Sequence, residues 1–204
     1  MTDSVLQPGA TTEPVGGKRE ARLEAARAFV RRVKELERGE LAMLKRNAGN
    51  TLAQSRGVTW FYRLLDQEAR GIDVEIYFLI ATLMGLNKLE TSGDFGRSMA
   101  RLKSVTESDS VERRFRILLD AEFDRLEGYR PGGGELAFRL RQLVKLAATK
   151  EVGIDWAQLL CDLRRWNDPQ KRVQKCWAQS FYAPATTVQS NISATSAQTP
   201  KQGD

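Results

Sequence analysis

Side chains that commonly do chemistry are scarce in this chain. It contains no histidine, the commonest general base and a frequent metal ligand. Its two cysteines, Cys161 and Cys176, lie far apart and belong to no metal-binding motif, so they cannot form a zinc site by themselves. We interpret them as reduced, partly buried thiols of a cytosolic protein.

The acidic and glycine-rich segments supply no catalytic group either. Asp120, Glu122 and Asp124 are the nearest approach to an acidic cluster, but alternate positions on a helix point in different directions. We interpret them as a salt-bridging face. Residues 16–18 (GGK) lack the rest of a P-loop, and residues 132–134 (GGG) follow no strand. The sequence therefore predicts no catalytic residue, no metal and no cofactor, and an enzyme is the weakest functional reading.

Basic side chains carry the strongest functional signal, because they gather on helix faces. On the first long helix they recur at i, i+4, i+7 and i+11, beside an apolar stripe. Glutamates flank this stripe, so an ordinary solvated face is an equal alternative. The stripe comprises Arg27, Arg31, Lys34 and Arg38.

Smaller basic groups lie on later helices. Lys45 and Arg46 are adjacent on a short helix, and another helix carries two cations one turn apart, opposite its leucine stripe. The polar face of the last helix holds no acid after Asp168. Cations that share a face with amides and an aromatic ring suit phosphate contact and base stacking. The two later groups are Arg141 and Lys145, and Lys171, Arg172 and Lys175 with Gln179 and Tyr182.

The net charge agrees with a polyanionic partner. The formal charge is +6, and 41% of the residues are hydrophobic, enough for a real core. A basic balance favours nucleic acid or, less often, an anionic membrane surface. The most apolar run, residues 74–86, is too short to span a bilayer and carries Glu75, so it predicts a buried helix. With no apolar leader visible, we expect a cytoplasmic protein without a membrane partner.

Apolar periodicity predicts an all-α fold between two polar tails. Residues 1–17 and 184–204 are rich in Thr, Ser, Pro, Gly and Gln, which predicts disorder. The polar segment 104–109 divides the rest into an N-terminal lobe, residues 18–107, and a C-terminal lobe, residues 108–183. Each lobe is expected to be a small helical bundle. Helices are predicted over residues 18–38, 40–47, 60–70, 73–86, 95–103, from 110 to a turn at 131–134, 135–149, from 155, and from 168 to 182.

Capping residues and apolar stripes define the C-terminal helices further. Ser110 is the expected N-cap of one helix, and Asp155 is expected to cap a later one, in a capping box with Gln158. Asp168 is the expected N-cap of the last helix, with Pro169 at its first position. The predicted core positions are Val111, Phe115, Leu118, Leu126, Leu136, Leu140, Leu143, Ala147, Trp156, Leu159, Leu160, Leu163, Trp166, Val173, Cys176, Trp177 and Phe181.

Several segments, taken in order, carry a family resemblance. They are residues 39–46 (GELAMLKR), 61–65 (FYRLL), 95–100 (FGRSMA), 110–115 (SVERRF), 135–144 (ELAFRLRQLV), 154–166 (IDWAQLLCDLRRW) and 172–182 (RVQKCWAQSFY). Together they resemble the CasB family, the small subunit of the type I-E CRISPR surveillance complex called Cascade. The resemblance is more specific in the C-terminal half than before Phe95.

The resemblance implies a two-lobed helical protein with no catalytic residues of its own. Its expected partners are a second copy of itself, the backbone and large subunits of Cascade, the guide RNA, and the target and non-target DNA strands. Its basic surfaces are expected to hold the DNA strands and stabilise the R-loop in antiviral defence. Seven nucleic-acid-binding residues follow from the matching motifs: Lys45, Arg46, Arg97, Arg101, Arg141, Lys171 and Arg172. Lys175 joins them from the face argument alone.

Two other classes of protein fit the pattern less well. A helix-turn-helix regulator could be built from residues 155–166, a tight turn and the helix that begins near residue 170. Such a protein would bind duplex DNA alone and with sequence preference. A scaffold whose basic faces contact only acidic protein neighbours is the other alternative, and its affinity for nucleic acid would be negligible even at low salt.

Overall fold

The computed structural model describes residues 15–48, 50–66, 69, 72–123 and 134–183. Over these ranges the predicted all-α fold is confirmed, since they contain no strand and only an isolated bridge between Ala48 and Asn50. The tail residues 1–14 and 184–204, and the predicted turn at 131–133, lie outside the described residues, as do Leu126 and Asp124. The expected tail was too long at one end, because residues 15–17 are helical.

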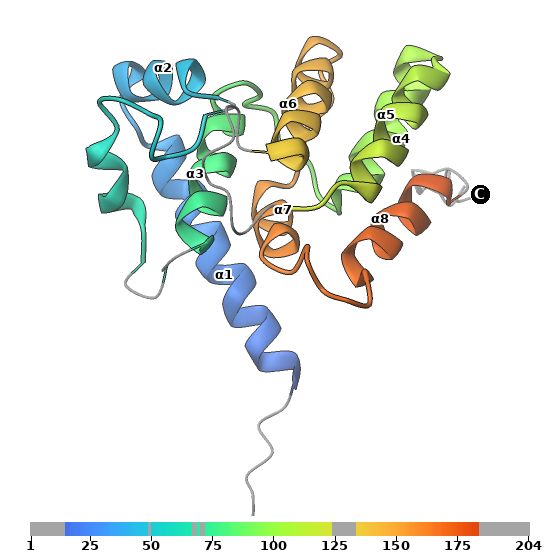
Figure 1. Ribbon diagram of the computed structural model, residues 1–204, viewed down its shortest axis with the longest axis horizontal. Helices are drawn as coiled ribbons and strands as arrows, with labels where there is room; N and C mark the ends of the chain where they lie inside the picture. The colour runs from blue at the N-terminus through green and yellow to red at the C-terminus, as the bar shows by residue number, and fades with distance from the viewer. Residues whose placement is uncertain (1–14, 49, 67–68, 70–71, 124–133, 184–204) are drawn as a thin grey trace, which may run out of the picture.

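The helices are arranged as a row, with α1 and α3 on one side and α4, α5 and α8 on the other (Figure 1). Between them lie α6 and α7. No described helix is long and apolar enough to cross a membrane. The elements are α1 (Val15–Lys34), α2 (Arg38–Arg46), the 3-10 helix η1 (Thr59–Leu64), α3 (Ile72–Met84), α4 (Phe95–Thr106), α5 (Asp109–Asp120), α6 (Gly134–Thr149), α7 (Trp156–Leu163) and α8 (Arg172–Tyr182).

The first helices break at a different residue from the one predicted. Gly39 was expected to separate them, but it lies inside α2. Glu37 is extended and forms a capping box with Glu40, whose carboxylate accepts the Glu37 backbone N–H at 3.3 Å. This box fixes the start of α2 at Arg38, so the glycine has no terminating role.

The helix predicted over residues 60–70 is also wrong, because the described part of this segment is the short 3-10 helix η1. Arg32 of α1 donates to the carbonyl of Leu64 at 3.0 Å and to the carboxylate of Asp66 at 2.8 Å. The Leu64 carbonyl thus accepts a hydrogen bond from a side chain far away in the sequence, and the next residue, Leu65, has an extended backbone. A tertiary contact therefore ends this helix, which no local pattern signals.

The helices α4 and α5 lie on either side of the predicted lobe boundary. Helix α4 runs three residues further than expected, and Glu107 follows it in the left-handed region at φ 50°. The predicted N-cap Ser110 is wrong by two residues: the hydroxyl of Ser108 accepts the backbone N–H of Ser110, so Asp109 is already helical. The division into two lobes stays a prediction.

The C-terminal helices confirm one cap and correct another. Asp155 caps α7 by accepting the Gln158 backbone N–H at 2.9 Å, although the Gln158 side chain turns to Asp162 rather than closing a capping box. Helix α8 begins later than predicted, at Arg172. The Asp168 carboxylate accepts the Gln170 N–H at 3.0 Å, and its carbonyl accepts the N–H of Lys171 at 2.8 Å. Residues 168–171 are therefore a turn.

The core is one cluster of apolar side chains that spans both predicted lobes. Every predicted core position of the C-terminal helices within the described residues is buried except Cys176, whose exposed thiol points toward Asp94 at 3.6 Å. Residues 76–81 of α3 are buried, as the apolar run predicted. The three tryptophans Trp156, Trp166 and Trp177 are at most 1% exposed, so the prediction that they are core residues is confirmed.

Helix α4 and helix α8 approach each other at Gly96. A Cβ added there would lie 2.0 Å from the carbonyl oxygen of Trp177, so only glycine permits this approach. Phe95 packs on the ring of Trp177 with centroids 5.1 Å apart. The backbone of α4 and the basic start of α8 are thus held in a fixed relation.

Candidate nucleic-acid interface

The predicted binding residues lie on four elements and do not share one pocket. All are exposed except Arg141, which is half-buried. No group of three or more potential metal ligands occurs among the residues that the structure describes. The interface is therefore a set of cationic faces, whose positions are set by the helices beneath them. The eight residues are Lys45 and Arg46 on α2, Arg97 and Arg101 on α4, Arg141 on α6, and Lys171, Arg172 and Lys175 at the start of α8.

The cations of α4 lie against the loop that precedes this helix. Asp94 caps α4 by accepting the backbone N–H of Arg97 at 2.9 Å. The Arg97 side chain packs over Gly93, while the Arg101 guanidinium donates to the hydroxyl of Thr91. Neither arginine has an acidic side chain as ion-pair partner among the described residues. Both charges are therefore available to an anion.

The position of Arg97 is unfavourable for helix stability. It is the third residue of α4, where the partial positive charge of the helix dipole lies, and a cation there costs about 0.3–1 kcal/mol. The Asp94 carboxylate offsets part of this cost. Helix stability therefore gives no reason for a cation at this position.

The cations at the start of α8 surround a turn. Arg172 pairs with Asp168 at 3.3 Å and donates to Gln170 at 3.0 Å. Lys171 stands in the left-handed region at φ 49°, which is uncommon for a residue with a side chain. Lys175 is exposed one helical turn further on. Two of these three cations thus lack an acidic partner within the described chain.

The predicted residues on α2 and α6 differ in their surroundings. Arg46, at the C-terminal end of α2, donates to the carbonyl of Ala42 at 3.3 Å, and cations at this end of a helix are stabilised by its dipole. The Nε of Arg141 is buried and has no acceptor among the described residues. Arg139 on the same helix pairs with Glu135, one turn away, at 3.2 Å.

The basic stripe on the first helix is shorter than predicted. Helix α1 ends at Lys34, so Arg38 belongs to α2 and leaves the stripe. Arg27 and Arg31 both approach Glu24, at 3.6 Å and 3.2 Å, and Lys34 pairs with Glu90 at 2.6 Å. Of the flanking glutamates in the sequence, Glu24 therefore forms ion pairs with two cations of the stripe.

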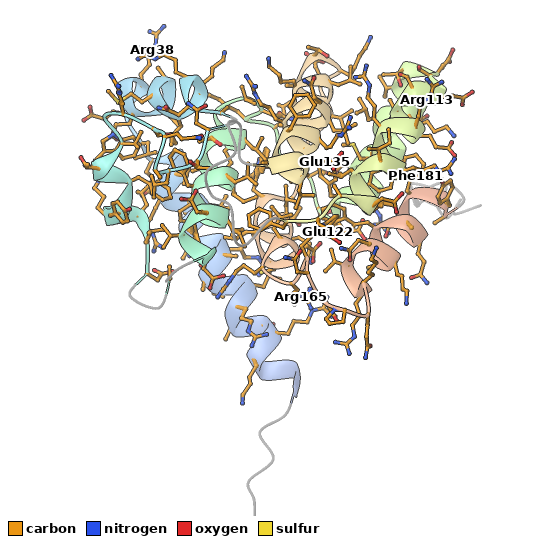
Figure 2. All side chains as sticks on the ribbon, in the orientation of Figure 1. Arg38, Arg113, Glu122, Glu135, Arg165 and Phe181 are labelled. Atoms are coloured by element: carbon orange, nitrogen blue, oxygen red, sulfur yellow. The ribbon has the colours of Figure 1, made fainter. Side chains whose placement is uncertain are left out.

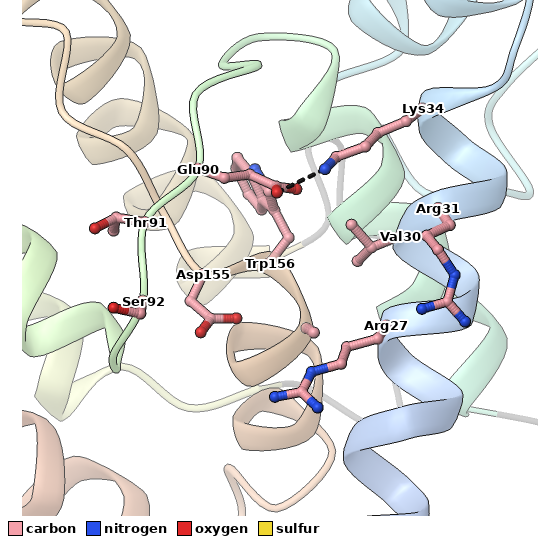
Figure 3. Close-up of a pocket in the computed structure, with 10 residues that line it drawn as sticks. Arg27, Val30, Arg31, Lys34, Glu90, Thr91, Ser92, Asp155 and Trp156 are labelled. Atoms are coloured by element: carbon pink, nitrogen blue, oxygen red, sulfur yellow. Dashed lines mark ion pairs between the residues drawn. The ribbon is translucent and has the colours of Figure 1, made fainter.

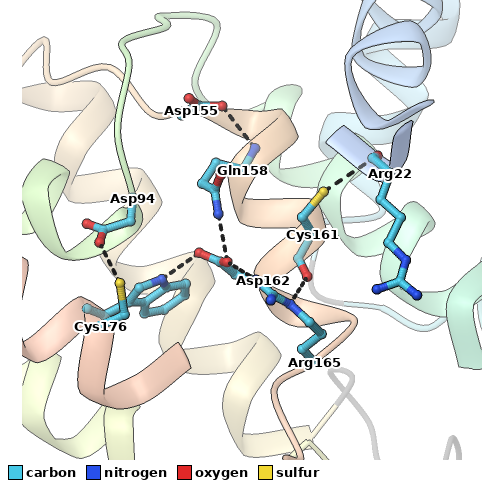
Figure 4. A network of polar contacts seen from close by, with 9 residues as sticks. Arg22, Asp94, Asp155, Gln158, Cys161, Asp162, Arg165 and Cys176 are labelled. Carbon is cyan, nitrogen blue, oxygen red and sulfur yellow. Dashed lines mark hydrogen bonds and ion pairs between the residues drawn. The ribbon is translucent and has the colours of Figure 1, made fainter. Parts of the chain in front are cut away.

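Two carboxylates fix α7, α4 and α8 beneath these surfaces (Figure 4). Asp162, which is 4% exposed, accepts hydrogen bonds from the Trp177 indole at 2.7 Å and the Gln158 amide at 2.8 Å. Burial raises the pKa of Asp162, against these hydrogen bonds and the charge of Arg165, which lower it. Asp94 accepts from Ser180 at 2.6 Å, which joins the start of α4 to α8.

The two cysteines are not activated nucleophiles. Desolvation by the surrounding protein is the main cause that raises the pKa of Cys161 and of the largely exposed Cys176, and nearby Asp162 and Asp94 respectively raise it further. A thiol with a raised pKa stays protonated near neutral pH and is a poor nucleophile. Neither residue provides a reactive centre.

A sequence profile of the family described as CRISPR-associated protein Cse2 matches residues 40–182. That span includes all eight predicted binding residues. The chain belongs to the Cse2 family. A Cse2 protein of Thermus thermophilus is 40% identical over 110 residues, which are 53% of this chain and 56% of the relative's length. The chain thus spans little more than half the length of that curated relative.

Solved structures agree with membership of the Cse2 family. The crystal structure of M. ruber CasB is 28% identical and superimposes with a TM-score of 0.63, covering 78% of this chain and 92% of that one. The resemblance to CasB is thereby confirmed. A chain of a CRISPR RNA-guided surveillance complex is 23% identical with a TM-score of 0.62, covering 78% of this chain and 92% of its own, and it shows the same fold.

Proposed function

We propose that this Cse2-family chain is the non-catalytic small subunit of a type I-E CRISPR RNA-guided surveillance complex. Its partners are the backbone and large subunits, a second copy of itself, the guide RNA and the two strands of the target DNA. Its basic helical faces hold the target and displaced strands and so stabilise the R-loop. Family membership and the fold shared with a chain of a surveillance complex support the place in the assembly.

The observation that carries the binding role is the pair Arg97 and Arg101 on α4. Both are exposed, both lack an acidic partner among the described residues, and Arg97 stands where a cation lowers helix stability. Opening a DNA duplex against a guide RNA is nearly balanced in free energy, so modest phosphate contacts shift it toward the open state. Such contacts neutralise charge without reading base sequence.

The connection between α7 and α8 favours this proposal over a helix-turn-helix regulator. The two helices of that motif are joined by a turn of about 3–4 residues. Here residues 164–171 separate α7 from α8. In addition, the Trp177 indole binds Asp162 of α7 in the buried interior, so α8 is anchored in the core along the face opposite its cations.

A tagged pull-down tests the place in the assembly. The chain is expressed with its neighbouring genes, and the eluate is run on protein and denaturing RNA gels. We expect several other subunits and one discrete short RNA of repeat-derived sequence. Recovery of the chain alone, without RNA, contradicts the proposal and makes the regulator the next candidate.

Charge removal on α4 tests the role in the R-loop. In the assembled complex, Arg97→Gln with Arg101→Gln is expected to lower target-duplex opening about 3–10-fold at low salt, and less at higher salt, because the two lost phosphate contacts contribute less as salt rises. Arg113→Gln with Arg116→Gln on α5 removes the same charge from another exposed face and serves as control. Equal opening by both variants excludes the α4 pair from strand binding.

A further inference from the structure

Two cavities lie end to end along the seam between α1 and α7. The helices are antiparallel there: the thiol of Cys161, late in α7, points at the carbonyl of Arg22, early in α1, at 3.7 Å. The lower cavity lies beside the N-terminal half of α1. The upper cavity lies beside its C-terminal half and the start of α7.

The lower cavity, of about 660 Å³, is lined mainly by cations. Its one acid, Asp73, is already paired with Arg164 at 2.8 Å. Arg19 and Arg22 are exposed, and their guanidinium groups have no ion-pair partner within the described part of the chain. Arg165 reaches the buried Asp162 at 3.2 Å but is half-exposed (Figures 2 and 4). The cavity therefore carries uncompensated positive charge.

The upper cavity, of about 400 Å³, has a mixed lining, in which three cations of α1 lie across from the carboxylates of Glu90 and Asp155 (Figure 3). Arg27 and Arg31 line it from α1. Both approach Glu24, at 3.6 Å and 3.2 Å, but stay more than half exposed. Lys34 closes the far end of the cavity through the ion pair with Glu90. Behind Glu90 lies the ring of Trp156, whose buried indole N–H has no acceptor among the described residues. A buried indole N–H normally finds an acceptor, so a hydrogen-bond donor next to this cavity is unused.

Together the two cavities form a track rather than a point site. The rise of an α-helix places Arg19 and Lys34 about 22 Å apart, with cations distributed between them. A row of cations of this length matches a polymer with repeated charges better than a small anion. At its upper end the track reaches the loop of Thr91, whose hydroxyl accepts from Arg101, so this end lies next to a cation of α4.

The lining favours a nucleic-acid strand over a protein neighbour. Protein interfaces usually contain an apolar core with exposed aromatic or aliphatic side chains. None of the large exposed hydrophobic residues among the described ranges lines either cavity. Guanidinium groups, which dominate here, form paired hydrogen bonds to phosphate oxygens.

We propose that the α1–α7 seam is a second strand-binding track, which holds the phosphodiester backbone of single-stranded nucleic acid from Arg19 and Arg22 to Arg27 and Arg31. This inference rests on the proposed function and adds residues that the family motifs did not indicate. The seam reads no base sequence, because its cations meet phosphates.

The test measures binding of the full chain to a fluorescein-labelled single-stranded DNA of about 20 nucleotides by anisotropy, from about 50 mM salt upward. Arg19→Gln with Arg22→Gln is expected to weaken binding about tenfold and to reduce the slope of log affinity against log salt by about 1–2. Arg113→Gln with Arg116→Gln has the same spacing and charge, lies on α5 away from α1 (Figure 2), and is expected to change binding less than about twofold. Circular dichroism confirms that both variants are folded.

Three other results of this binding experiment would each lead to a different conclusion. If the seam variant binds like its control while Arg97→Gln with Arg101→Gln binds weakly, the seam inference is overturned and the proposed function stands. If the seam variant loses affinity only for a labelled polyglutamate peptide of equal charge, the seam receives an acidic protein and the inference is overturned. If the wild-type chain binds no strand even at low salt, strand binding by this subunit fails and the inference fails with it.

Discussion

At the scale of single residues, charge is placed where stability alone does not require it. Arg97 stands near the positive end of the α4 dipole, and the carboxylate of Asp162 lies in the core between α7 and α8. For the first feature we propose contact with a phosphate. The second is structural, because the Asp162 oxygens meet the Trp177 and Gln158 donors, and it has a consequence for the pH dependence of stability.

Asp162 is expected to make the folded state gain stability as the pH falls. Its folded-state pKa is raised by burial, so the folded chain takes up a proton at a higher pH than the unfolded chain does. The cost of the buried charge is relieved in the window from the raised pKa down to its usual 3.8. The Asp162→Asn variant lacks this effect.

Urea unfolding of both proteins across that window checks this expectation. The free energy of unfolding of the wild type, relative to that of Asp162→Asn, should rise as the pH falls. A constant difference would show that the carboxyl has the same pKa in both states.

At the scale of elements, contacts between helices position the predicted binding residues. The approach of α4 to α8 at Gly96 fixes Arg97 and Arg101 relative to the start of α8, and the Asp94–Ser180 hydrogen bond supports it. The end of η1 is likewise set from outside, by Arg32 of α1. Helix boundaries in this protein are therefore partly tertiary properties.

Gly96→Ala is expected to destabilise the protein by about 3 kcal/mol or more, because the added methyl group meets backbone that cannot move aside. Gly39→Ala on α2 is the matched control. Its added methyl group meets nothing within 4 Å, and alanine favours the helix by about 0.5–1 kcal/mol. Thermal unfolding of both variants should show opposite shifts, and equal midpoints would contradict the close approach.

At the scale of the whole molecule, the predicted lobes share one core. Phe95 of α4 packs on Trp177 of α8, and the Leu89 carbonyl accepts the Ile154 backbone N–H at 3.1 Å. Residues on the two sides of the predicted boundary at 107/108 thus complete each other's packing. A separated lobe would expose a large apolar surface to water.

We therefore expect the chain to unfold in a single cooperative transition. Fluorescence and circular dichroism should give the same urea midpoint. A fragment that begins at Ser108 should show no cooperative transition, since α8 loses Phe95 and Gly96. Two separate transitions, or a cooperatively folded fragment, would instead show that the lobes are independent.

The sequence by itself determined the all-α class, the core stripes, the cap at Asp155 and the family, because apolar periodicity, local capping and ordered motifs are properties of neighbouring residues. It also singled out the cations of α4 and α8. Only the tertiary structure decided where η1 ends, why glycine stands at position 96, and that Arg19, Arg22 and Arg165 meet at one cavity. These features depend on atoms that the fold brings together from distant parts of the chain, and local patterns carry no information on such distances.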